Sequence, residues 1–325
     1  MAIAEEYQDK KLSFAGKSRL WTYIALGRLT KGTSTKGRKI VTLLCLPLYF
    51  LVYPFKFWKT PKVKNFKHEL GLCLIIKNEG DYIKEWIDYH RLIGVDIFYI
   101  FDNESTDNTL DILKPYIEEG IVKYQLIKGK GRQMDAYNIV INKERKNCRY
   151  IGFLDADEFI HLDNGVGLKE TLSSVFDKHS DCAAVGLNWL LFGSSNLKNK
   201  SNEPVIKRFV YHSEPNFKEN KHIKSIVNPR LVMDFRNPHF ALYKKGYSAY
   251  NLNDGKIHGP FNEDMTNTSI RINHYFTKSE EEFMIKRGKG FADQPGSRNV
   301  EEYNYMNRNE IFDDSMLKYA EKLQK

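Results

Sequence analysis

The chain has 325 residues, of which 42% are hydrophobic and 28% are charged. This balance excludes an intrinsically disordered protein, and the length allows one large or two modest domains with a substantial core. The formal net charge of +9 favours an anionic partner, such as nucleotide phosphates, nucleic acid or an acidic membrane surface. The four cysteines are scattered without a Cys-x-x-Cys pair, so we expect neither a zinc site nor a disulfide framework, and free thiols suit the cytosol.

Residues 1–66 form a basic region around an apolar run at residues 40–58. A membrane-spanning helix needs about 20 apolar residues, whereas this run is short, is broken by Pro47 and Pro54, and has basic flanks. No signal peptide is expected. We expect the run to lie on the cytoplasmic, anionic surface of a membrane, with Trp58 at the boundary. A segment packed on the folded domain and a true single span are the alternatives.

From residue 70 onward, apolar runs of strand length alternate with amphipathic helical patterns. Strands are expected at residues 70–76, 95–101, 121–127 and 149–154. Helices are expected at residues 81–92, 106–119 and 132–145. Because each strand is followed by a helix, this order predicts an α/β fold. Its central sheet is expected to be mostly parallel, with right-handed crossovers and helices on both faces.

After residue 160 the pattern is less regular. We expect a helix at 168–178, a strand at 182–191, and short aromatic-rich strands up to residue 275. Ser279 and Glu282 have the spacing of a capping box, which predicts a helix over 279–286. A charged helix is expected at 310–325. No flexible linker interrupts residues 67–295, so we predict one domain with its site at the seam between 67–160 and 161–295, and a helical tail at 296–325.

The most informative stretch is Tyr150–Ile160, where an apolar strand leads into Asp155-Ala156-Asp157-Glu158. Open α/β sheets bind ligands at the carboxyl ends of their strands. Asp155 and Asp157 are two residues apart, so in an extended segment their side chains point the same way. Two such carboxylates repel each other unless a cation lies between them, and Mg²⁺ or Mn²⁺ holding a substrate phosphate is the simplest candidate. The alternative is an acidic loop that caps the next helix.

Two further polar loops, at residues 77–80 and 102–109, follow the first two predicted strands. Parallel strands end at the same edge of a sheet, so these loops are expected to converge on the acid pair. There, Asp102 is expected to accept hydrogen bonds from a ribose or a base, and Asn78 to pair with a base edge. Asp107 is expected to cap the following helix.

Three of these blocks resemble the GT-A fold glycosyltransferases, in particular the family-2-like group and its galactosyltransferase relatives of family 92. The blocks are Leu74–Glu79, Asp102–Thr109 and Leu154–Phe159. Two later blocks, Lys221–Val227 and Asn273–Phe283, are similar to the family 92 pattern. The resemblance covers residues 70 to 290, roughly, and it implies a GT-A fold in which 67–160 is the nucleotide-binding half and 161–295 the acceptor half.

The resemblance also implies a chemistry. An inverting, metal-dependent enzyme would move a hexose from a nucleotide sugar, usually a UDP-sugar, to a glycan or lipid-linked acceptor in surface polysaccharide synthesis. Mn²⁺ or Mg²⁺ would be held by Asp155, Asp157 and His274, with Asp157 essential for catalysis. The donor pocket would be formed by Asn78, Glu79, Asp102, Arg132, Asp135 and Asp155. For Arg132 and Asp135 the alternative is a role in the first turn of a helix, and for His274 it is a structural hydrogen bond.

One carboxylate should deprotonate the acceptor hydroxyl. The candidates are Glu158, Glu263, Asp264, Glu281 and Glu282. Glu282 is expected to be used by the capping box, and we choose Glu281 because it lies in the block that resembles family 92. Trp189 is expected either to stack on an acceptor sugar or to pack in the core. His222 and His239 are expected to be structural.

Two other functions stay open. A sugar nucleotidyltransferase also uses a parallel sheet, carboxylates and a metal, but it would carry a glycine-rich basic loop after the first strand, which residues 77–80 do not form. A non-catalytic basic protein would bind nucleic acid or a membrane through basic stripes on its folded part. Much of the basic excess lies instead in the first 70 residues, so we expect no nucleic-acid partner.

Overall fold

The computed structural model of the chain describes residues 63, 65–289 and 299–323. The predicted membrane-surface run at 40–58 lies outside these residues. The first half contains β1 (His68–Ile76), α5 (Ile83–Leu92), β2 (Ile97–Asp102), α6 (Thr109–Glu118), β3 (Val122–Leu126), α7 (Gln133–Glu144) and β4 (Cys148–Phe153). Each predicted strand and helix of this half is confirmed to within three residues. No helix within the described ranges is long and apolar enough to cross a membrane.

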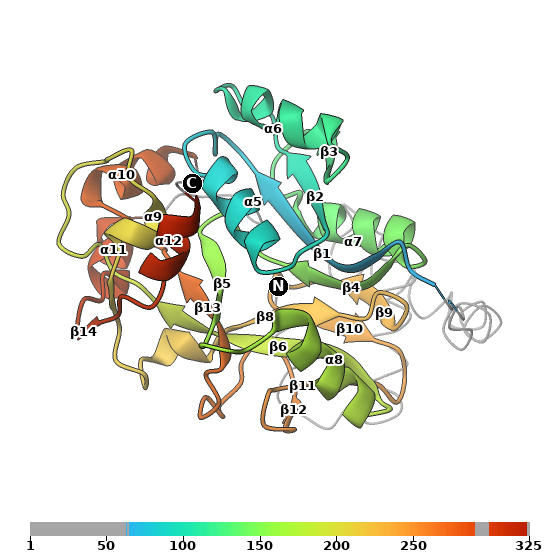
Figure 1. Ribbon diagram of the computed structural model, residues 1–325. Helices are drawn as coiled ribbons and strands as arrows, with labels where there is room; N and C mark the ends of the chain where they lie inside the picture. The colour runs from blue at the N-terminus through green and yellow to red at the C-terminus, as the bar shows by residue number, and fades with distance from the viewer. Residues whose placement is uncertain (1–62, 64, 290–298, 324–325) are drawn as a thin grey trace, which may run out of the picture.

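The second half contains more elements, and many of them are short (Figure 1). They are β5 (Glu158–Leu162), α8 (Leu168–Lys178), β6 (Cys182–Leu191), α9 (Val205–Arg208), β7 (Tyr211–His212), η2 (Lys218–Lys221), β8 (Ile223–Val227), β9 (Val232–Phe235), β10 (Ala241–Tyr243), β11 (Ser248–Tyr250), β12 (Lys256–Ile257), β13 (Ile270–His274), α10 (Glu280–Lys289), α11 (Val300–Met306), β14 (Ile311–Phe312) and α12 (Leu317–Leu323). The predictions for α8 and β6 are confirmed.

The described elements build a ten-stranded mixed sheet with the path β12-β11-β6-β8-β4-β1-β2-β3, to which β13 and β5 add through β6. The pairs β4–β1, β1–β2 and β2–β3 are all parallel, as predicted. Strand β8 runs antiparallel between β4 and β6, which makes the sheet mixed at its centre. Strands β1, β2 and β3 therefore end at the same edge as the acid pair that follows the parallel strand β4.

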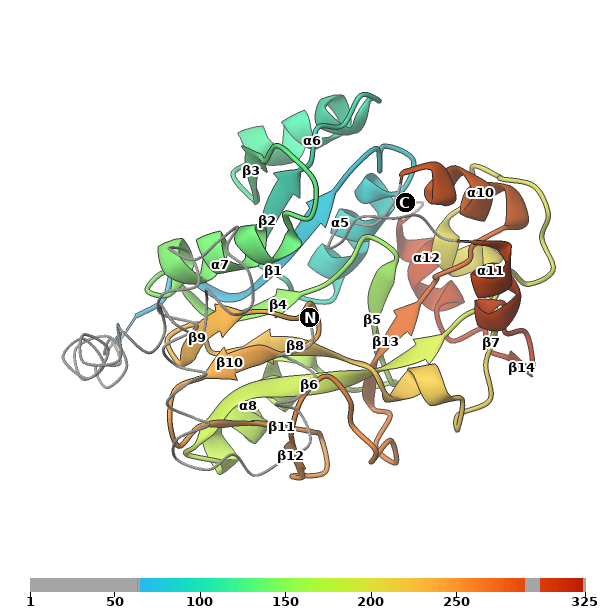
Figure 2. The ribbon, with the colours of Figure 1, turned by 180° about the vertical axis from the view of Figure 1, so that it is seen from behind.

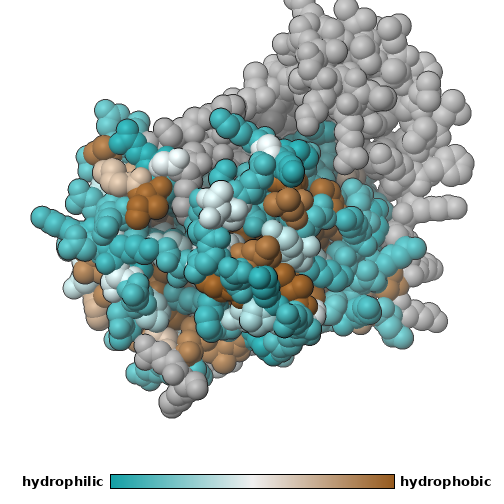
Figure 3. Space-filling model, turned by 90° about the horizontal axis from the view of Figure 1, so that it is seen from above, coloured by the Kyte–Doolittle hydropathy of each residue, from teal (hydrophilic) through white to brown (hydrophobic). Residues whose placement is uncertain are grey.

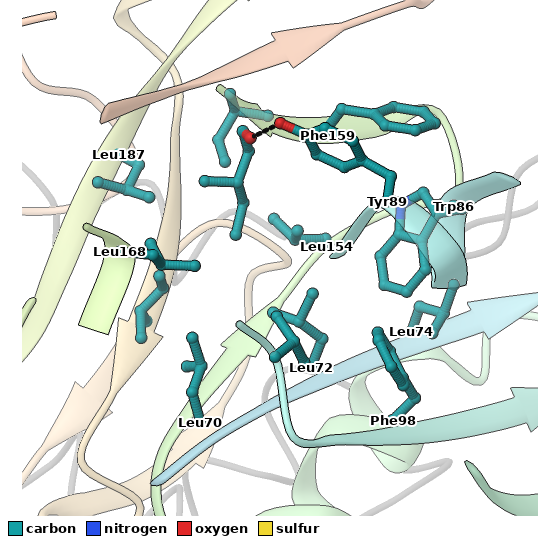
Figure 4. Packing of buried hydrophobic residues seen from close by; sticks show 14 of the residues in the cluster. Leu70, Leu72, Leu74, Trp86, Tyr89, Phe98, Leu154, Phe159, Leu168 and Leu187 are labelled. Atoms are coloured by element: carbon teal, nitrogen blue, oxygen red, sulfur yellow. Dashed lines mark hydrogen bonds between the residues drawn. The ribbon is translucent and has the colours of Figure 1, made fainter. Parts of the chain in front are cut away.

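Two layers of helices and strands cover the sheet, as Figures 1 and 2 show. Along β1, Leu70, Leu72 and Leu74 face the layer that contains α5, α6 and α8, whereas Cys73 and Ile75 face α7 and the β9–β10 hairpin. Burial on both faces explains why β1 is a continuous apolar run rather than an alternating one. Figure 4 shows the first layer, where the Tyr89 hydroxyl donates to the Ile160 carbonyl at 2.5 Å and ties α5 to β5.

The carboxyl-terminal helix predicted at 310–325 is confirmed only at Leu317–Leu323, and the prediction is wrong for the residues before it. Strand β14 pairs with β7, a turn follows in which the Asp313 carboxylate accepts the Ser315 N–H at 2.8 Å, and only then does α12 begin. Met316 and Ala320 are buried in the same core cluster as α5. Asp313 is also held by Arg271 of β13 at 2.7 Å. The described part of the tail is therefore packed into the domain.

The face of the molecule that lies on top in Figure 1 is mainly polar. Figure 3 shows hydrophilic side chains over most of the described part of this face, with hydrophobic residues in small, separate patches. Such a surface does not offer a large apolar docking area, because single exposed apolar residues are normal on soluble domains.

His90 on α5 is held as a neutral imidazole in the core. It is fully buried; its Nδ1 lies 2.8 Å from the Trp86 carbonyl, and the Ile160 N–H donates to its Nε2 at 3.3 Å. A carbonyl can only accept and an amide N–H can only donate, so Nδ1 carries the proton and Nε2 keeps its lone pair. Burial lowers the pKa of His90 to about 3.

This arrangement predicts acid-labile stability. The folded pKa is below the unfolded value of 6.5, so the unfolded state binds the proton first. The free energy that neutral His90 contributes to the stability of the fold is fully present above pH 6.5. It is lost at about 1.4 kcal/mol per pH unit as the pH falls towards 3. Urea unfolding between pH 7 and pH 5 should show this dependence of the unfolding free energy on pH. In His90→Gln, the number of protons taken up on unfolding should be smaller by about one. An unchanged slope in His90→Gln would contradict the neutral assignment.

Candidate active site

Asp155 lies just beyond β4 and is held by two partners. Its Oδ2 accepts from the Lys224 ammonium at 2.7 Å, and its Oδ1 accepts from the Gln133 amide at 2.8 Å. Its own backbone N–H donates to Glu158 Oε2 at 2.8 Å, which closes a tight turn before β5. The Asp155 side chain keeps 36% of its surface exposed. One carboxylate of the predicted pair therefore lies at the surface of the sheet edge with its orientation fixed.

Lys224 comes from the antiparallel strand β8 and lies almost completely buried between two acids. Its Nζ is 2.7 Å from Asp155 and 3.3 Å from Glu158 Oε2. Burial alone would lower the pKa of Lys224, but the two carboxylates outweigh it and raise the pKa. Burial raises the pKa of the fully buried Glu158 to about 8, although Lys224 opposes it. Asp155, at the shorter distance, is therefore the main partner of this lysine.

Asp157 is the buried member of the pair. It forms an ion pair with Lys286 of α10, and the Nε2 atom of His274 lies 3.6 Å from its Oδ2. Burial would raise the pKa of Asp157, but the charge of Lys286, with His274 as a second and smaller influence, outweighs it and holds the pKa well below its usual value. Burial also lowers the pKa of His274, against the opposing charge of Asp157. A carboxylate and a neutral imidazole therefore meet here.

The predicted metal set of Asp155, Asp157 and His274 is partly assembled. Two carboxylates and a neutral imidazole are donors that suit Mn²⁺ or Mg²⁺, and Asp157 and His274 lie together. Asp155, however, pairs with Lys224. Within the ranges that the structure describes, no three His, Cys, Asp or Glu side chains form a group placed to hold a metal ion. The donor chemistry fits the metal, while lysine ammonium groups pair with both carboxylates.

The two polar loops converge as predicted, but their side chains mainly hold each other. Asn78 has a left-handed backbone with φ 54°, and its Oδ1 accepts the Thr106 N–H at 2.7 Å. Asp102 is only 2% exposed and accepts from the Ser105 N–H at 2.7 Å and from the Tyr124 hydroxyl at 2.9 Å. Both oxygens of Asp102 are thus used to shape the loop, and its predicted nucleotide contact stays a prediction.

Three other predicted residues lie in these loops or in the first turn of α7. Glu79 donates its backbone N–H to the Thr109 hydroxyl at 3.0 Å. Arg132 and Asp135 pair with each other at 2.7 Å where α7 begins, which is the structural alternative named for them. The side chain of Arg132 is 35% exposed and that of Asp135 is 41% exposed. They remain accessible for the predicted contact with the donor. Asp107 was predicted to cap α6, but the N-cap is Asn108; Asp107 stands one position earlier and accepts the N–H of Thr109, the first residue of the helix.

Glu281, the predicted base, is the second residue of α10. Its Oε2 accepts the Lys200 N–H at 2.7 Å. It precedes Lys286 by five residues, which places it about 140° around the helix from the side chain that reaches Asp157. Glu282 is used by the capping box, as predicted: it accepts from the Ser279 hydroxyl at 2.6 Å and pairs with Arg208. The described contacts therefore do not bring Glu281 to the acid pair, and its role as base stays a prediction.

An aromatic cluster adjoins His274. The Trp189 ring is 4.2 Å from the His274 ring and stacks on His222 at 4.7 Å, and the exposed Phe261 packs edge-on against His222. His239 completes the cluster at 5.0 Å from Trp189. Trp189 Nε1 is buried without a hydrogen-bond partner in the described part of the chain. Both predicted roles of Trp189, core packing and sugar stacking, are compatible with this half-buried position.

Sequence reasoning missed Lys224, Gln133 and Lys286 as site residues. Lys224 lies 69 residues from Asp155 in sequence and Lys286 lies 129 from Asp157. No local spacing connects such positions, because they meet only through the order of strands in the sheet. The one available signal was chemical: Lys224 is a lysine inside an apolar strand, Ile223–Val227, and a buried lysine requires an acid.

The chain belongs to glycosyltransferase family 92. The family model matches residues 68–320, which includes every element described above except the last residues of α12. The prediction of an α/β GT-A fold is confirmed, with the sheet mixed rather than mostly parallel at its centre.

Curated relatives from plants agree with this family. A glycosyltransferase family 92 protein of Ricinus communis is 29% identical over 51% of this chain and 29% of its own length. One of Arabidopsis thaliana is 26% identical over 54% of this chain and 31% of its own length. The matched parts thus span about a third of these relatives. Among solved structures, residues 1–349 of S. aureus TarS in complex with UDP are 18% identical over 50% of this chain and 47% of that one. The TM-score of this match is 0.33, so we base no argument on it.

Proposed function

We propose that this chain is a metal-dependent, inverting hexosyltransferase that uses a nucleotide sugar, with UDP as the nucleotide, and a glycan or lipid-linked acceptor. The observation that carries the proposal is the pair of Asp155 and Asp157 at the carboxyl edge of the parallel strands, with His274 beside Asp157, in a domain of family 92. Ligands of open α/β sheets bind at this edge.

Asp155, Asp157 and His274 would hold the metal, with the Lys286 ammonium leaving Asp157 when the ion binds. When bound, Mn²⁺ or Mg²⁺ supplies a Lewis acid that stabilises charge on the leaving diphosphate. Lys224 and Gln133 fix the direction of the Asp155 carboxylate. Lys286, once released, would remain near the acid pair as a cation for a phosphate. His274 is neutral at pH 7, which leaves a lone pair for the metal.

The acceptor would enter beside the Trp189 cluster. This cluster borders His274, and Phe261 leaves 45% of its surface exposed. An aromatic ring contacts the apolar face of a sugar well. Trp189→Ala is therefore expected to raise the KM for the acceptor about tenfold or more, with a smaller effect on the KM for the donor. Steady-state kinetics with each substrate varied in turn measures both constants. An equal rise in the two would indicate a purely structural role.

A screen for hydrolysis of nucleotide sugars tests the proposal directly. The full chain with Mn²⁺ is expected to hydrolyse one UDP-sugar faster than the corresponding GDP- or CMP-sugars, and Asp155→Asn should abolish the hydrolysis. The matched control is Asp111→Asn, on the exposed surface of α6, which should leave the rate unchanged. Hydrolysis that is equal with Mn²⁺ and with a chelator would count against the proposal.

We place the enzyme at the cytoplasmic face of a membrane, held there by residues 40–58. The basis is the sequence pattern of that run, since it lies outside the described residues. The full chain is expected to co-sediment with anionic vesicles, whereas a chain lacking residues 1–60 should stay in the supernatant. Equal partition of the two proteins would remove this part of the proposal.

A further inference from the structure

A cavity of about 440 Å³ lies at the edge of the sheet opposite the acid pair. Strands β4 and β6 begin there and β8 ends there, and Figure 2 shows the start of β1 and helix α8 on the same side of the molecule. The lining residues that matter here are Phe66, Arg149, Asp177, His179, Asn228 and Arg230. Arg149 precedes Asp155 by six residues, so the cavity is about 20 Å from the donor site along the strand.

Arg230 is a buried cation without an acidic partner. The residue is 7% exposed, and its guanidinium donates to the carbonyls of Cys148 at 3.3 Å and Arg149 at 3.2 Å while stacking on Phe66 at 4.4 Å. Among residues 63, 65–289 and 299–323, no carboxylate forms an ion pair with Arg230; the nearby Glu69 and Asp177 pair with Arg149 instead. Burial lowers its pKa to about 10, so it is still charged at pH 7. A buried charge of this kind is costly unless an anion compensates it.

Two further donors line the same cavity. Arg149 pairs with Glu69 at 2.8 Å and more weakly with Asp177 at 3.6 Å, and the Asp177 side chain is 70% exposed. Asn228 accepts the Arg230 N–H with its Oδ1 at 3.2 Å, and no described residue accepts from its amide NH₂ group. Two guanidinium groups and an amide are donors that bind an anion with several oxygens, and guanidinium is well suited to phosphate.

We propose that this cavity binds the phosphate group of a ligand other than the sugar donor, with Arg230 as the central contact. The position of the cavity suggests two sources. Residues 1–62 contain 12 Lys or Arg and 3 Asp or Glu, which accounts for the whole net charge of +9. This basic region joins the described domain at Val63 and Phe66, which line the cavity. A lipid headgroup at a membrane surface is one source, and a soluble phosphate monoester is the other.

The test uses the full chain and two variants of the cavity. Arg230→Met removes the central cation, whereas Asn228→Asp keeps it and supplies a competing carboxylate in the place of the amide, so this variant is expected to fold. Calorimetric titration with inorganic phosphate and with glycerol phosphate should show binding to the wild type that weakens about tenfold in both variants. Arg91→Met, in an exposed ion pair with Glu119, is the matched control and should bind as the wild type does.

Vesicles distinguish the two sources. Phosphatidylcholine vesicles with and without phosphatidic acid are sedimented with each protein. If the ligand is a lipid headgroup, the extra binding caused by phosphatidic acid is expected to weaken in both variants. A soluble source predicts weaker titration with glycerol phosphate and unchanged sedimentation. The proposal is overturned if the wild type binds neither inorganic phosphate nor glycerol phosphate, or if folded Asn228→Asp binds both as tightly as the wild type.

Discussion

Replacing Asp157 by asparagine is expected to reduce sugar transfer by about a thousandfold or more while the protein stays folded. An amide is a poorer ligand than a carboxylate for a hard divalent cation. It also carries no charge to balance the ammonium group of Lys286, which meets Asp157 in the structure. The Lys286 side chain is 19% exposed, so it has access to water when its partner is removed. The fold is therefore expected to tolerate the change.

Three measurements belong together in this experiment: turnover of the UDP-sugar, thermal unfolding, and binding of Mn²⁺ followed by electron paramagnetic resonance. Asp157→Asn should lose turnover and Mn²⁺ binding and keep a cooperative transition. Asp111→Asn, far from the site on α6, should match the wild type in all three. Wild-type turnover in Asp157→Asn would refute the assignment of Asp157 to the metal.

Replacing Lys224 by methionine is expected to destabilise the domain by about 3–5 kcal/mol. Lys224 is 1% exposed and is the cation between Asp155 and the fully buried Glu158. Without it, the part-exposed Asp155 carboxylate and the buried acid of Glu158 lose the cation that they share, and the turn from β4 to β5 loses its central contact. Because this turn carries Asp155 and Asp157, transfer should fall as well. Urea unfolding at pH 7 measures the loss of stability.

A second variant separates charge from packing at this position. If the cost arises from the acids left without their cation, adding Glu158→Gln to Lys224→Met should recover part of the lost stability, because an amide that cannot ionise then replaces the buried acid. If the double variant is less stable than Lys224→Met by the full cost of Glu158→Gln alone, the charges are not coupled. That result would contradict the role given to Lys224.

The parallel half of the fold was predictable because its signals are local. Strand β1 is buried on both faces and so reads as one apolar run, and α6 ends where Gly120 adopts a positive φ of 82°. The second half was less accessible. Strand β5 has only five residues and follows directly on the acid turn, and β14 pairs with a two-residue strand about 100 residues away. Pairing between such short, distant segments leaves no periodic pattern in the sequence.

The candidate site shows the same division. Asp155 and Asp157 were predictable because they follow a buried strand at a known edge of the sheet. Lys224 and Lys286 were not, because β8 and α10 bring them to the site from distant parts of the chain. Asp102 shows the converse case: its residue type and place suggested a ligand contact, and the structure uses both of its oxygens within the loop.

The most direct test of the donor site is a calorimetric titration of UDP into the full chain with and without Mn²⁺, repeated on Asp157→Asn. We expect UDP to bind the wild type only when Mn²⁺ is present, and to bind Asp157→Asn weakly under both conditions. Binding of equal strength with and without the metal, or the same affinity in both proteins, would contradict the assignment of the acid pair to a metal that holds the nucleotide diphosphate.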